Sequence, residues 1–584
     1  MKRLFAITAF LLIAACSPSE SPDAGTAVTE QPTAAPAGPW DRGAIATAAN
    51  PHAVNAAIEM LEKGGHAVDA AIAAHAVLGL VEPQSSGIGG GGFMLIYERS
   101  TQALAFHDGR EIAPAGATID MFMRDGEEID RVAAWQSGIS VGAPGAIALY
   151  KSAHDDFGRL PWADVFEPAI RLAREGFEVS PRLANFLPFV AEMGRLDENP
   201  PTAAYFYPDG EPLQVGHILK NPEYADTLTR IANEGIDAFY KGEIAEAIAR
   251  AAQAPPNGGT LTAQDIANYK VEKREVVCGN FRALIICTTT PPSSGGAQIM
   301  IAGLYDHLIK DAVSQEDKVA AFVDAQRLAY ADRDHYFGDP DSVAVPLDDL
   351  LNPAYIEHRA TERFEPGAAP THGDPGSVLR GEPVANRWSK DTTDEVAGTT
   401  HLSIIDNDGN AVSMTATVEA PFGSSRWAHG FLLNNEMTDF AKSYDPDAPP
   451  AANAVGPGRR PRSSMSPTMV FDENGDILMV TGSPGGNSIP AYVSKSIVAV
   501  LDWNMSAQDA VDFPNIIARG ENVRVEIGVE PGQSIADDLA ARGYKVLERD
   551  GENSGLHIIV VRPDELDGAA DKRREGIVRT ITVN

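Results

Sequence analysis

The stretch "DEVAGTTHLSIIDNDGNAVSMTATVE", residues 394–419, predicts a β-hairpin with an unusual beginning. Apolar and polar residues alternate on both sides of Asn407-Asp408-Gly409-Asn410, and a turn of this composition between alternating segments is typical of a hairpin. The residues before it, 365–398, are polar, interrupted by prolines and without periodicity. Because long structureless runs are rare inside compact domains, we expect residues of about 366–398 to be mobile or open to cleavage.

The threonine pair that begins the strand has two interpretations. A threonine hydroxyl needs a base within hydrogen-bond reach before it can act as a nucleophile. An N-terminal threonine supplies that base itself, because its free α-amine has a pKa of about 8. Backbone cleavage before Thr399 would free such an amine. The simpler interpretation is that Thr399 and Thr400 reflect only the preference of threonine for strands.

Composition limits the partners of this protein. The chain has 584 residues, 81 acidic and 47 basic, and a net charge of −34. This charge repels phosphate backbones, so we expect no nucleic-acid partner. No His, Cys and Asp cluster has metal-ligand spacing, and we expect no metal and no organic cofactor. Gly87, Gly89 and Gly92 fit a nucleotide-binding spacing, but they follow a predicted helix and not a strand, so a tight backbone turn is favoured.

The N-terminus predicts export. Residues 1–15 begin with Lys2 and Arg3 and continue in an apolar run that is too short to span a bilayer, as in a signal peptide. Residues 13–16, Ile-Ala-Ala-Cys, resemble the bacterial lipobox, which implies that Cys16 is lipidated and becomes the mature N-terminus. Cleavage a few residues later is the alternative. Residues 16–40 are predicted to form a disordered tether. The expected location is the periplasmic face of a membrane, or a soluble periplasmic or secreted state.

The two other cysteines, Cys278 and Cys287, lie in "REVVCGNFRALIICTTT". If the chain turns at Arg282-Ala283, they fall directly opposite one another on a hairpin and can form a disulfide. If the turn slips by one residue, the pairing is lost and both remain buried thiols.

Several motifs occur together along the chain. Downstream of residue 398, "TTH", "GNAVSMT", "FGSS", "LLNNEMTDF", "RPRSSMSPT" and "TGSPGG" follow in order, and "VEPQSSGIGGGGFMLIY", "GREIAP" and "PPSSGG" precede them. From about Ala44 to the C-terminus the chain resembles the γ-glutamyltransferase family, also called glutathione hydrolases, of the N-terminal-nucleophile superfamily. The resemblance implies an α+β fold, a four-layer αββα sandwich with extra helices from the large subunit. It also implies self-cleavage into a large subunit, 41–398, and a small catalytic subunit, 399–584, which form a heterodimer.

The resemblance assigns the catalytic residues. Gly398 would end the large subunit and Thr399 would be the nucleophile, with Thr417 as its hydrogen-bond partner. The N–H groups of Gly485 and Gly486 would form the oxyanion hole, since two adjacent donors aimed at one point suit a tetrahedral intermediate. Taken without the other motifs, "GSPGG" would be read as an ordinary tight turn.

It also assigns the substrate-binding residues. Arg110, Ser463 and Ser464 would bind the α-carboxylate of a γ-glutamyl group, because a guanidinium binds carboxylates with two parallel bonds. Glu436 and Asp439 would accept from its ammonium group. The implied reaction is attack of Thr399 on the γ-amide of glutathione or a related donor, followed by transfer to water or an amino acid. On their own, Arg110 would suit a surface ion pair with Glu111, and Asp439 a turn.

Glu419 departs from the family pattern, which has asparagine there. A carboxylate still accepts from an ammonium group, but it adds charge beside Glu436 and Asp439 and so affects substrate preference. Residues 441–455 are shorter than the lid loop of some bacterial members, which favours hydrolysis. The rivals are an amidase of other acyl specificity, similar to cephalosporin acylases, and a catalytically silent surface lipoprotein. Retention of Thr399 and Thr417 argues against the silent protein.

Overall fold

The computed structural model describes residues 40–582, except residues 195, 363, 392, 397 and 443. The predicted signal peptide and Cys16 lie outside the described residues, as does all of the tether except residue 40. Within the described part, no helix is long and apolar enough to cross a membrane.

The quoted stretch forms a hairpin at the centre of the molecule. Strand β11 (Gly398–Ile405) pairs with β12 (Ala411–Glu419), and Thr399 lies opposite Thr417. The turn is held by Asp406, whose Oδ1 accepts the backbone N–H groups of Asp408 and Asn410 at 2.9 and 3.0 Å. The predicted hairpin and its threonine start are confirmed.

This hairpin belongs to a seven-stranded antiparallel sheet that is buried on both faces. In β2, Phe93 and Leu95 enter the core between the two large sheets, whereas Met94 and Ile96 enter the core under the outer helices. Residues buried on both faces explain why this strand reads as a continuous apolar run. The strand order is β22 (Ile577–Ile581), β1 (Ala44–Ala48), β11, β12, β2 (Gly91–Glu98), β3 (Ala103–Gly109) and β8 (Glu272–Arg274).

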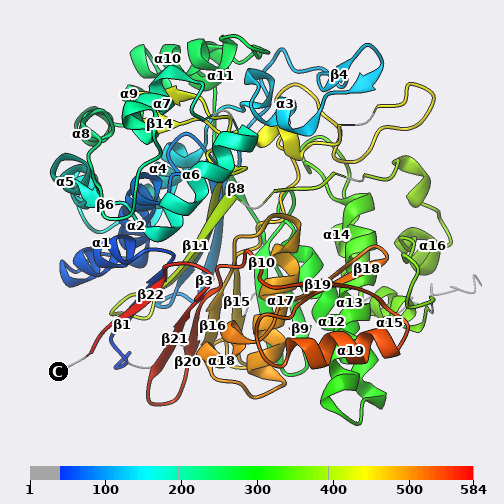
Figure 1. Ribbon diagram of the computed structural model, residues 1–584. Helices are drawn as coiled ribbons and strands as arrows, with labels where there is room; N and C mark the ends of the chain where they lie inside the picture. Colours follow the sequence, from blue (N-terminus) through cyan, green and yellow to red (C-terminus); the bar gives the residue numbers. More distant parts are fainter. Residues whose placement is uncertain are drawn as a thin grey trace, which may run out of the picture.

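A six-stranded antiparallel sheet lies against the inner face of the first sheet (Figure 1). The residues between the two sheets form one apolar core, in which Tyr97 of β2 contacts Phe471 at a ring-centroid distance of 5.0 Å. The strand order is β21 (Leu566–Ala570), β20 (His557–Val561), β16 (Ile477–Thr481), β15 (Thr468–Phe471), β10 (Leu284–Thr289) and β9 (Val276–Phe281).

Helices cover the outer face of the seven-stranded sheet and appear blue to cyan in Figure 1. Asn50 caps the first of them and Pro51 occupies its first turn, as predicted. The covering helices are α1 (Pro51–Glu62), α2 (Ala67–Val81) and α4 (Ala146–Phe157). Around them lie α5 (Glu167–Glu175), α6 (Pro181–Gly194), α7 (Pro200–Phe206), α8 (Pro222–Glu234), α9 (Asp237–Tyr240), α10 (Glu243–Gln253) and α11 (Ala263–Ala267).

A second group of helices covers the six-stranded sheet on the opposite side of the molecule (Figure 1). It comprises α12 (Gly295–Leu308), α13 (Gln315–Tyr336), α15 (Pro353–Thr361), α17 (Ile489–Leu501) and α18 (Ala507–Asp512). The result is the predicted four-layer αββα sandwich. Beside it, β17 (Ile516–Arg519), β18 (Asn522–Glu526), β19 (Lys545–Arg549) and α19 (Gly532–Ala541) form a small separate layer.

The short elements lie mainly in the connections between these layers. They are α3 (Arg131–Trp135), α14 (Leu347–Leu350) and α16 (Pro375–Arg380). The two-residue strands pair as β4 (Met123–Arg124) with β5 (Glu127–Glu128), β6 (Phe177–Glu178) with β7 (Ile218–Leu219), and β13 (Trp427–Ala428) with β14 (Phe431–Leu432).

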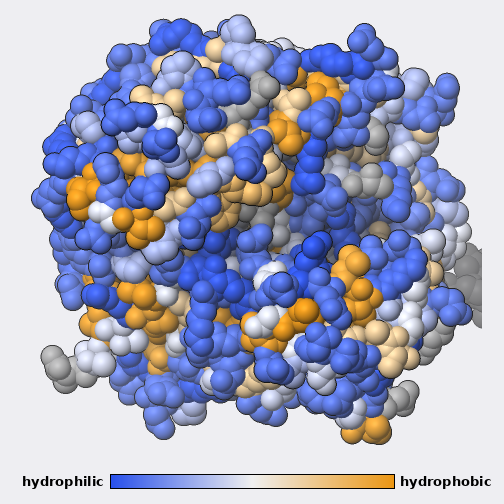
Figure 2. Space-filling model, in the orientation of Figure 1, coloured by the Kyte–Doolittle hydropathy of each residue, from blue (hydrophilic) through white to orange (hydrophobic). Residues whose placement is uncertain are grey.

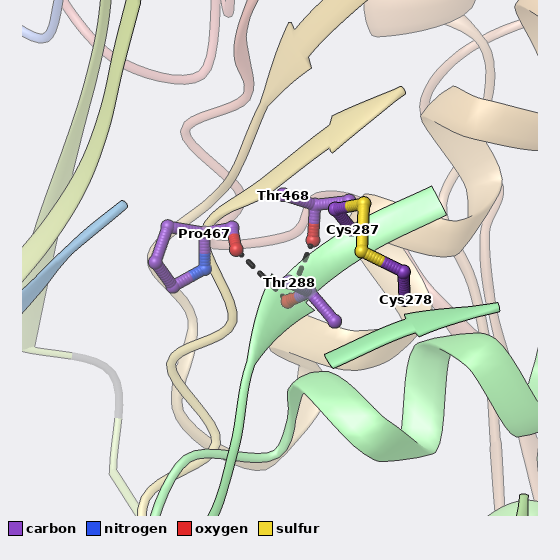
Figure 3. The surroundings of a disulfide bond; sticks show 5 residues. All are labelled: Cys278, Cys287, Thr288, Pro467 and Thr468. Carbon is purple, nitrogen blue, oxygen red and sulfur yellow. Dashed lines mark hydrogen bonds between the residues drawn. A yellow bond between two sulfur atoms is a disulfide. The ribbon is translucent and has the colours of Figure 1, made fainter. Parts of the chain in front are cut away.

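Cys278 and Cys287 lie directly opposite one another on β9 and β10, and the structure joins them in a disulfide (Figure 3). The chain turns at Arg282 and Ala283, so the register that allows the pairing is the one present. The next residue, Thr288, donates to the carbonyl oxygen of Pro467 at 2.9 Å and ties the hairpin to the start of β15.

Residues 366–398 have more structure than the sequence predicted. Asp374 caps the short helix α16 by accepting the N–H of Ser377 at 3.0 Å, and the N–H of Gly373 donates to Asp332 at 2.8 Å. The segment is therefore not structureless, and its contacts are those of the uncleaved chain. Its mobility after cleavage stays a prediction.

Candidate active site

The hydroxyl group of Thr417 connects the predicted nucleophile to the peptide bond that precedes it. It accepts from Thr399 Oγ1 at 3.2 Å and donates to the carbonyl oxygen of Gly398 at 2.7 Å. It also accepts the backbone N–H of Glu419 at 2.8 Å, so its position on β12 is fixed. All of these groups are buried. One hydroxyl thus contacts both the predicted nucleophile and the carbonyl group at the predicted cleavage site.

Gly398 lies where no other residue fits. A Cβ atom there would lie 2.3 Å from the carbonyl oxygen of Glu419 and 2.5 Å from the carbonyl carbon of Ala420. The strand register also shifts between Gly398 and Thr399, which turns the peptide predicted to be cleaved out of the regular ladder. Close approach of the backbone, and not flexibility, explains this glycine.

The loop between β16 and α17 carries the predicted oxyanion glycines. Gly485 has φ 135° and Gly486 has φ 56°, values that other residues rarely adopt. Neither N–H group donates a hydrogen bond to another residue in the described part of the chain. A Cβ atom on Gly486 would lie 2.5 Å from the carbonyl oxygen of Glu395, so the loop lies directly against the segment that precedes the predicted cleavage point.

Arg110 is fully buried and binds the two acids that were assigned to the substrate ammonium. Its guanidinium donates to Glu436, and to Asp439 Oδ2 at 2.6 Å. It also donates to the carbonyl oxygens of Pro461 and Arg462 at 3.1 and 2.9 Å, next to the predicted serine pair. Glu111 lies 3.8 Å away and is equally buried, so the alternative of a surface ion pair is wrong.

This cluster has more carboxyl groups than cations. Burial raises the pKa values of Glu436 and Asp439 well above their usual range, and raises the pKa of Glu111 to about 7, although Arg110 opposes each shift. Glu436 Oε2 and Asp439 Oδ1 are buried and accept no hydrogen bond from any residue that the structure describes. Free acceptor oxygens of this kind suit a ligand that brings its own N–H donors, such as an ammonium group.

Glu419, the residue that departs from the family pattern, is part of the same site. Its Oε1 accepts the N–H of Val396 at 3.2 Å, and its other oxygen accepts from the side-chain amide of Asn435. Burial raises the pKa of Glu419, and its charge in turn raises the pKa values of Glu436 and Asp439. In the uncleaved chain it therefore holds the segment before Thr399.

One serine of the predicted pair, Ser464, already binds a carboxylate from the chain itself. Glu395 accepts the N–H of Ser464 at 2.7 Å and a guanidinium N–H of Arg333 at 2.6 Å, and Arg333 also donates to Ser464 Oγ at 2.7 Å. Arg462 Nε lies 3.7 Å from the same carboxylate. Ser463 is buried beside them, and its Oγ accepts the N–H of Met465 at 3.2 Å.

Sequence reasoning missed three of these residues: Glu111, Arg333 and Glu395. Glu111 had a signal, since it follows Arg110 in "GREIAP". Arg333 and Glu395 had none, because they meet from the helix α13 and a loop 62 residues later.

Backbone cleavage before Thr399 would turn β11 into a strand that starts with a free amine in the middle of the sandwich. A nucleophile on the first residue of a central strand is the feature that defines the N-terminal-nucleophile hydrolases. The fold and the site place the uncleaved chain in this class.

The sequence model of the gamma-glutamyltranspeptidase family matches residues 53–581, so the chain belongs to this family. The glutathione hydrolase proenzyme of Escherichia coli (strain K12) is 38% identical over 536 residues, which cover 89% of this chain and 89% of the relative. That of Bacillus subtilis (strain 168) is 36% identical over 550 residues, covering 91% and 90%. The solved structure of a cephalosporin acylase from Bacillus halodurans shares the fold with a TM-score of 0.79 at 24% identity, covering 98% of this chain and 100% of that one.

Proposed function

We infer that the chain is a self-cleaving γ-glutamyltransferase and glutathione hydrolase. It breaks the γ-glutamyl amide of glutathione and related compounds and passes the γ-glutamyl group to water or to the amine of an amino acid or peptide. The observation that carries this proposal is the Thr417 hydroxyl, which contacts both Thr399 Oγ1 and the carbonyl oxygen of Gly398. Family membership and the relatives named as proenzymes support it.

Self-cleavage comes first. Thr399 Oγ1 adds to the carbonyl carbon of Gly398, and the hydroxyl of Thr417 donates to the carbonyl oxygen as negative charge develops there. The C–N bond then breaks, the nitrogen leaves as the α-amine of Thr399, and an ester joins Gly398 to Thr399 Oγ1. Water hydrolyses this ester. The products are a large subunit that ends at Gly398 and a small subunit that begins at Thr399.

The charged groups of the site fit the amino-acid end of a γ-glutamyl donor. Ser464, with Arg333 nearby, holds the Glu395 carboxylate before cleavage, and a substrate α-carboxylate takes this place once the segment leaves. Arg110 lies next to the same serines. The free oxygens of Glu436 and Asp439 then accept from the α-ammonium. This arrangement positions the γ-carbonyl group at Thr399.

Turnover uses the amine that cleavage creates. The α-amine takes the proton of Thr399 Oγ1 as the oxygen attacks the γ-carbonyl carbon, and the N–H groups of Gly485 and Gly486 stabilise the oxyanion. Collapse gives a γ-glutamyl ester and releases the amine of the leaving group. Water or another amine then resolves the ester. Each step uses groups of the protein and its substrates.

One gel and one assay test the proposal. Purified protein under denaturing conditions should give a larger and a smaller band, whereas Thr399→Ala should stay whole. The cleaved protein should release aniline from a chromogenic γ-glutamyl anilide, and a dipeptide acceptor separates transfer from hydrolysis. A wild-type chain that stays in one piece would refute the mechanism.

Glu419 supports a second candidate, an amidase of the same superfamily with another acyl group. It stands where the family has asparagine, and its charge raises the pKa values of Glu436 and Asp439, so the acyl group that these residues accept can differ from γ-glutamyl. Comparing γ-glutamyl, glutaryl and γ-glutamyl-α-amide anilides decides between the two, because glutaryl compounds lack the ammonium group.

We propose an exported location with Cys16 as a lipid anchor, so that the membrane is contacted only through the lipid. The disulfide between Cys278 and Cys287 supports an oxidising compartment. The test is fractionation of cells that express the full chain: Cys16→Ser should move the protein from the membrane to the soluble fraction. An unchanged membrane fraction would contradict the anchor.

A further inference from the structure

Arg574 holds the backbone of the predicted nucleophile. It lies in the loop between β21 and β22, and its Nη1 donates to the carbonyl oxygen of Thr399 at 3.2 Å. The same nitrogen donates to Ser85 Oγ at 3.3 Å, in the loop that follows α2. No step of the proposed reaction uses this side chain, so its contact with Thr399 needs an explanation of its own.

The guanidinium of Arg574 is a buried charge whose hydrogen bonds all go to neutral groups. Besides Thr399 and Ser85, it donates from Nε to the carbonyl oxygen of Ser554 at 3.3 Å and from Nη2 to that of Asn553 at 3.2 Å. No carboxylate of the residues that the structure describes forms a hydrogen bond or an ion pair with it. Buried charges are normally paired, because desolvation is costly. A donor with a purely structural role would not need this charge.

Arg574 nevertheless carries its charge at neutral pH. Burial lowers its pKa to about 9, and the positive charge of Arg182 acts in the same direction, whereas Glu82 and Asp571 oppose the shift. Burial also raises the pKa of Glu82, so the negative charge of this acid is disfavoured. The surroundings of the Thr399 carbonyl group therefore keep a positive charge that is balanced only in part.

This charge lies close to the position of the amine that self-cleavage would create. The nitrogen of Thr399 is three bonds from its carbonyl oxygen, so Arg574 Nη1 lies within about 7 Å of that nitrogen. Solvent screens a buried pair of charges only weakly. A nearby positive charge disfavours the protonated form of an amine. The free amine can take the proton of Thr399 Oγ1, whereas the protonated amine cannot.

The other titratable side chains on the elements around Thr399 do not cancel this effect. Glu419 ends β12 opposite Gly398, and burial raises its pKa and so disfavours its negative charge. Glu395 belongs to the segment that leaves after cleavage. Three further groups are neutral, because burial lowers the pKa values of the histidines and raises that of the tyrosine: His401 on β11, His557 on β20 and Tyr492 on α17.

We propose that Arg574 is a positioning residue that holds Thr399 by its carbonyl group and, through its charge, keeps the new α-amine unprotonated at neutral pH. The inference rests on the proposed function, because only self-cleavage creates this amine. It adds the loop between β21 and β22 to the parts of the chain on which turnover depends.

The pH dependence of turnover tests the charge of Arg574. The measured quantity is kcat/KM of the cleaved enzyme for γ-glutamyl 4-nitroanilide, whose acidic limb reports the base of the free enzyme. For Arg574→Gln we expect this limb to move up by about 0.5 to 1 pH unit, because the amine loses its positive neighbour. Arg574→Lys keeps the charge and should keep the limb, although its rate falls with the loss of the planar set of donors.

Ser85→Ala is the matched control for geometry. It removes one neutral partner of Arg574 Nη1 and changes no charge, so the acidic limb should equal that of the wild type. An Arg574→Gln enzyme with the wild-type limb would overturn the proposal, and so would an Arg574→Lys limb that shifts as far as that of Arg574→Gln.

The wild-type enzyme provides a second test that needs no variant to fold. Cyanate modifies only the unprotonated form of an amine, so its rate of reaction with the small-subunit N-terminus at several pH values, followed by mass spectrometry, gives the pKa of the amine. On the face drawn in Figure 2, the molecule is hollowed between the parts that carry α3 and β18, and a cavity of about 650 Å³ there reaches Gly485 of the oxyanion loop. This opening admits so small a reagent.

We expect a pKa below about 7.2 for this amine, against about 7.7 to 8 for an ordinary α-amine. An ordinary value in a cleaved and active enzyme would refute the role of Arg574 while the reaction itself stands. A chain that stays uncut, or that turns over no γ-glutamyl anilide, would refute the proposed function and with it this inference.

Discussion

At the residue scale, Thr417 makes two hydroxyl contacts that a threonine with only a structural role would not need. Its hydroxyl is an acceptor for Thr399 Oγ1 and a donor to the Gly398 carbonyl oxygen, so in the proposed mechanism it orients the nucleophile and polarises its target at the same time. Few side chains can do both, because the task needs one group with a donor and free lone pairs.

Replacement of this hydroxyl should therefore slow self-cleavage. For Thr417→Ala we expect the cleavage rate to fall by about 100-fold or more, as for loss of one donor to a developing oxyanion. The measurement is the time course of the two bands on a denaturing gel. Thr415→Ala is the matched control, since Thr415 lies two residues earlier on the same strand but its hydroxyl contacts His401 at 2.9 Å. Equal rates in the two variants would contradict the assigned role.

Glu111 gives the uncleaved protein a pH-dependent stability. Burial raises its folded-state pKa from 4.5 to about 7, against the opposing charge of Arg110 and together with that of Asp108. Between these two pH values the unfolded chain releases the proton while the folded chain keeps it. The contribution of Glu111 to stability is thus complete below pH 4.5 and is lost as pH rises to about 7.

We expect Glu111→Gln to remove this dependence. Both proteins carry Thr399→Ala, so that they stay uncut. The free energy of unfolding of the Glu111→Gln variant minus that of its parent should rise by about 3 kcal/mol as pH rises from 4.5 to about 7. Urea unfolding at several pH values measures it. Parallel curves for the variant and its parent would show that Glu111 is ionised throughout.

At the scale of elements, the loop between β16 and α17 joins the oxyanion glycines to the cleavage segment. Gly486→Ala would add strain at φ 56° and a contact of 2.5 Å with the carbonyl oxygen of Glu395. We expect a loss of roughly 1–3 kcal/mol and slower cleavage, because the segment must shift away from Thr417. Unfolding curves and the same gel measure the two effects.

Gly381→Ala is the control for strain alone. Gly381 has φ 74°, and no atom lies within 4 Å of the Cβ position. It should cost about 1 kcal/mol and leave cleavage unchanged. If both variants cleave themselves at the wild-type rate, the close contact between Gly486 and Glu395 does not affect self-cleavage.

The elements differ in how far sequence could predict them. The hairpin of β11 and β12 was predictable because its alternation and turn are local. Helix α16 was missed, although "GDPGS" places an acid cap before a first-turn proline, because six residues are too few to show a helical period. The hydrogen bonds among Arg333, Glu395 and Ser464 could not be predicted, since Arg333 and Ser464 are 131 residues apart.

At the scale of the whole molecule, residues 41–398 and 399–584 cannot be separate domains. In the seven-stranded sheet, β11 and β12 lie between β1 and β2, and β22 lies outside β1, so strands from the two parts alternate. In the six-stranded sheet, β15 pairs with β10. Motif order could reveal the family, and through it the sandwich, but no local pattern could reveal this interleaving.

The two products of cleavage should consequently stay together. We expect the cleaved protein to elute from a sizing column under native conditions at the volume of the uncut Thr399→Ala protein. The subunits should separate only at the denaturant concentration at which circular dichroism shows loss of structure, because each exposes strand edges and core without the other. Separation at a lower concentration would contradict the interleaved sheet.

The pairing of β1 with β22 has a consequence for the connectivity of the chain. Ala44, at the start of β1, lies opposite Ile581, at the end of β22, so the two ends of the folded body are neighbours. A circular permutant that joins these ends through a short linker and opens the chain between Gly398 and Thr399 would keep every strand pairing. In such a permutant, removal of the initiator methionine and not self-cleavage would free the α-amine of Thr399, and its roles as substrate of its own cleavage and as catalyst of turnover would be separated.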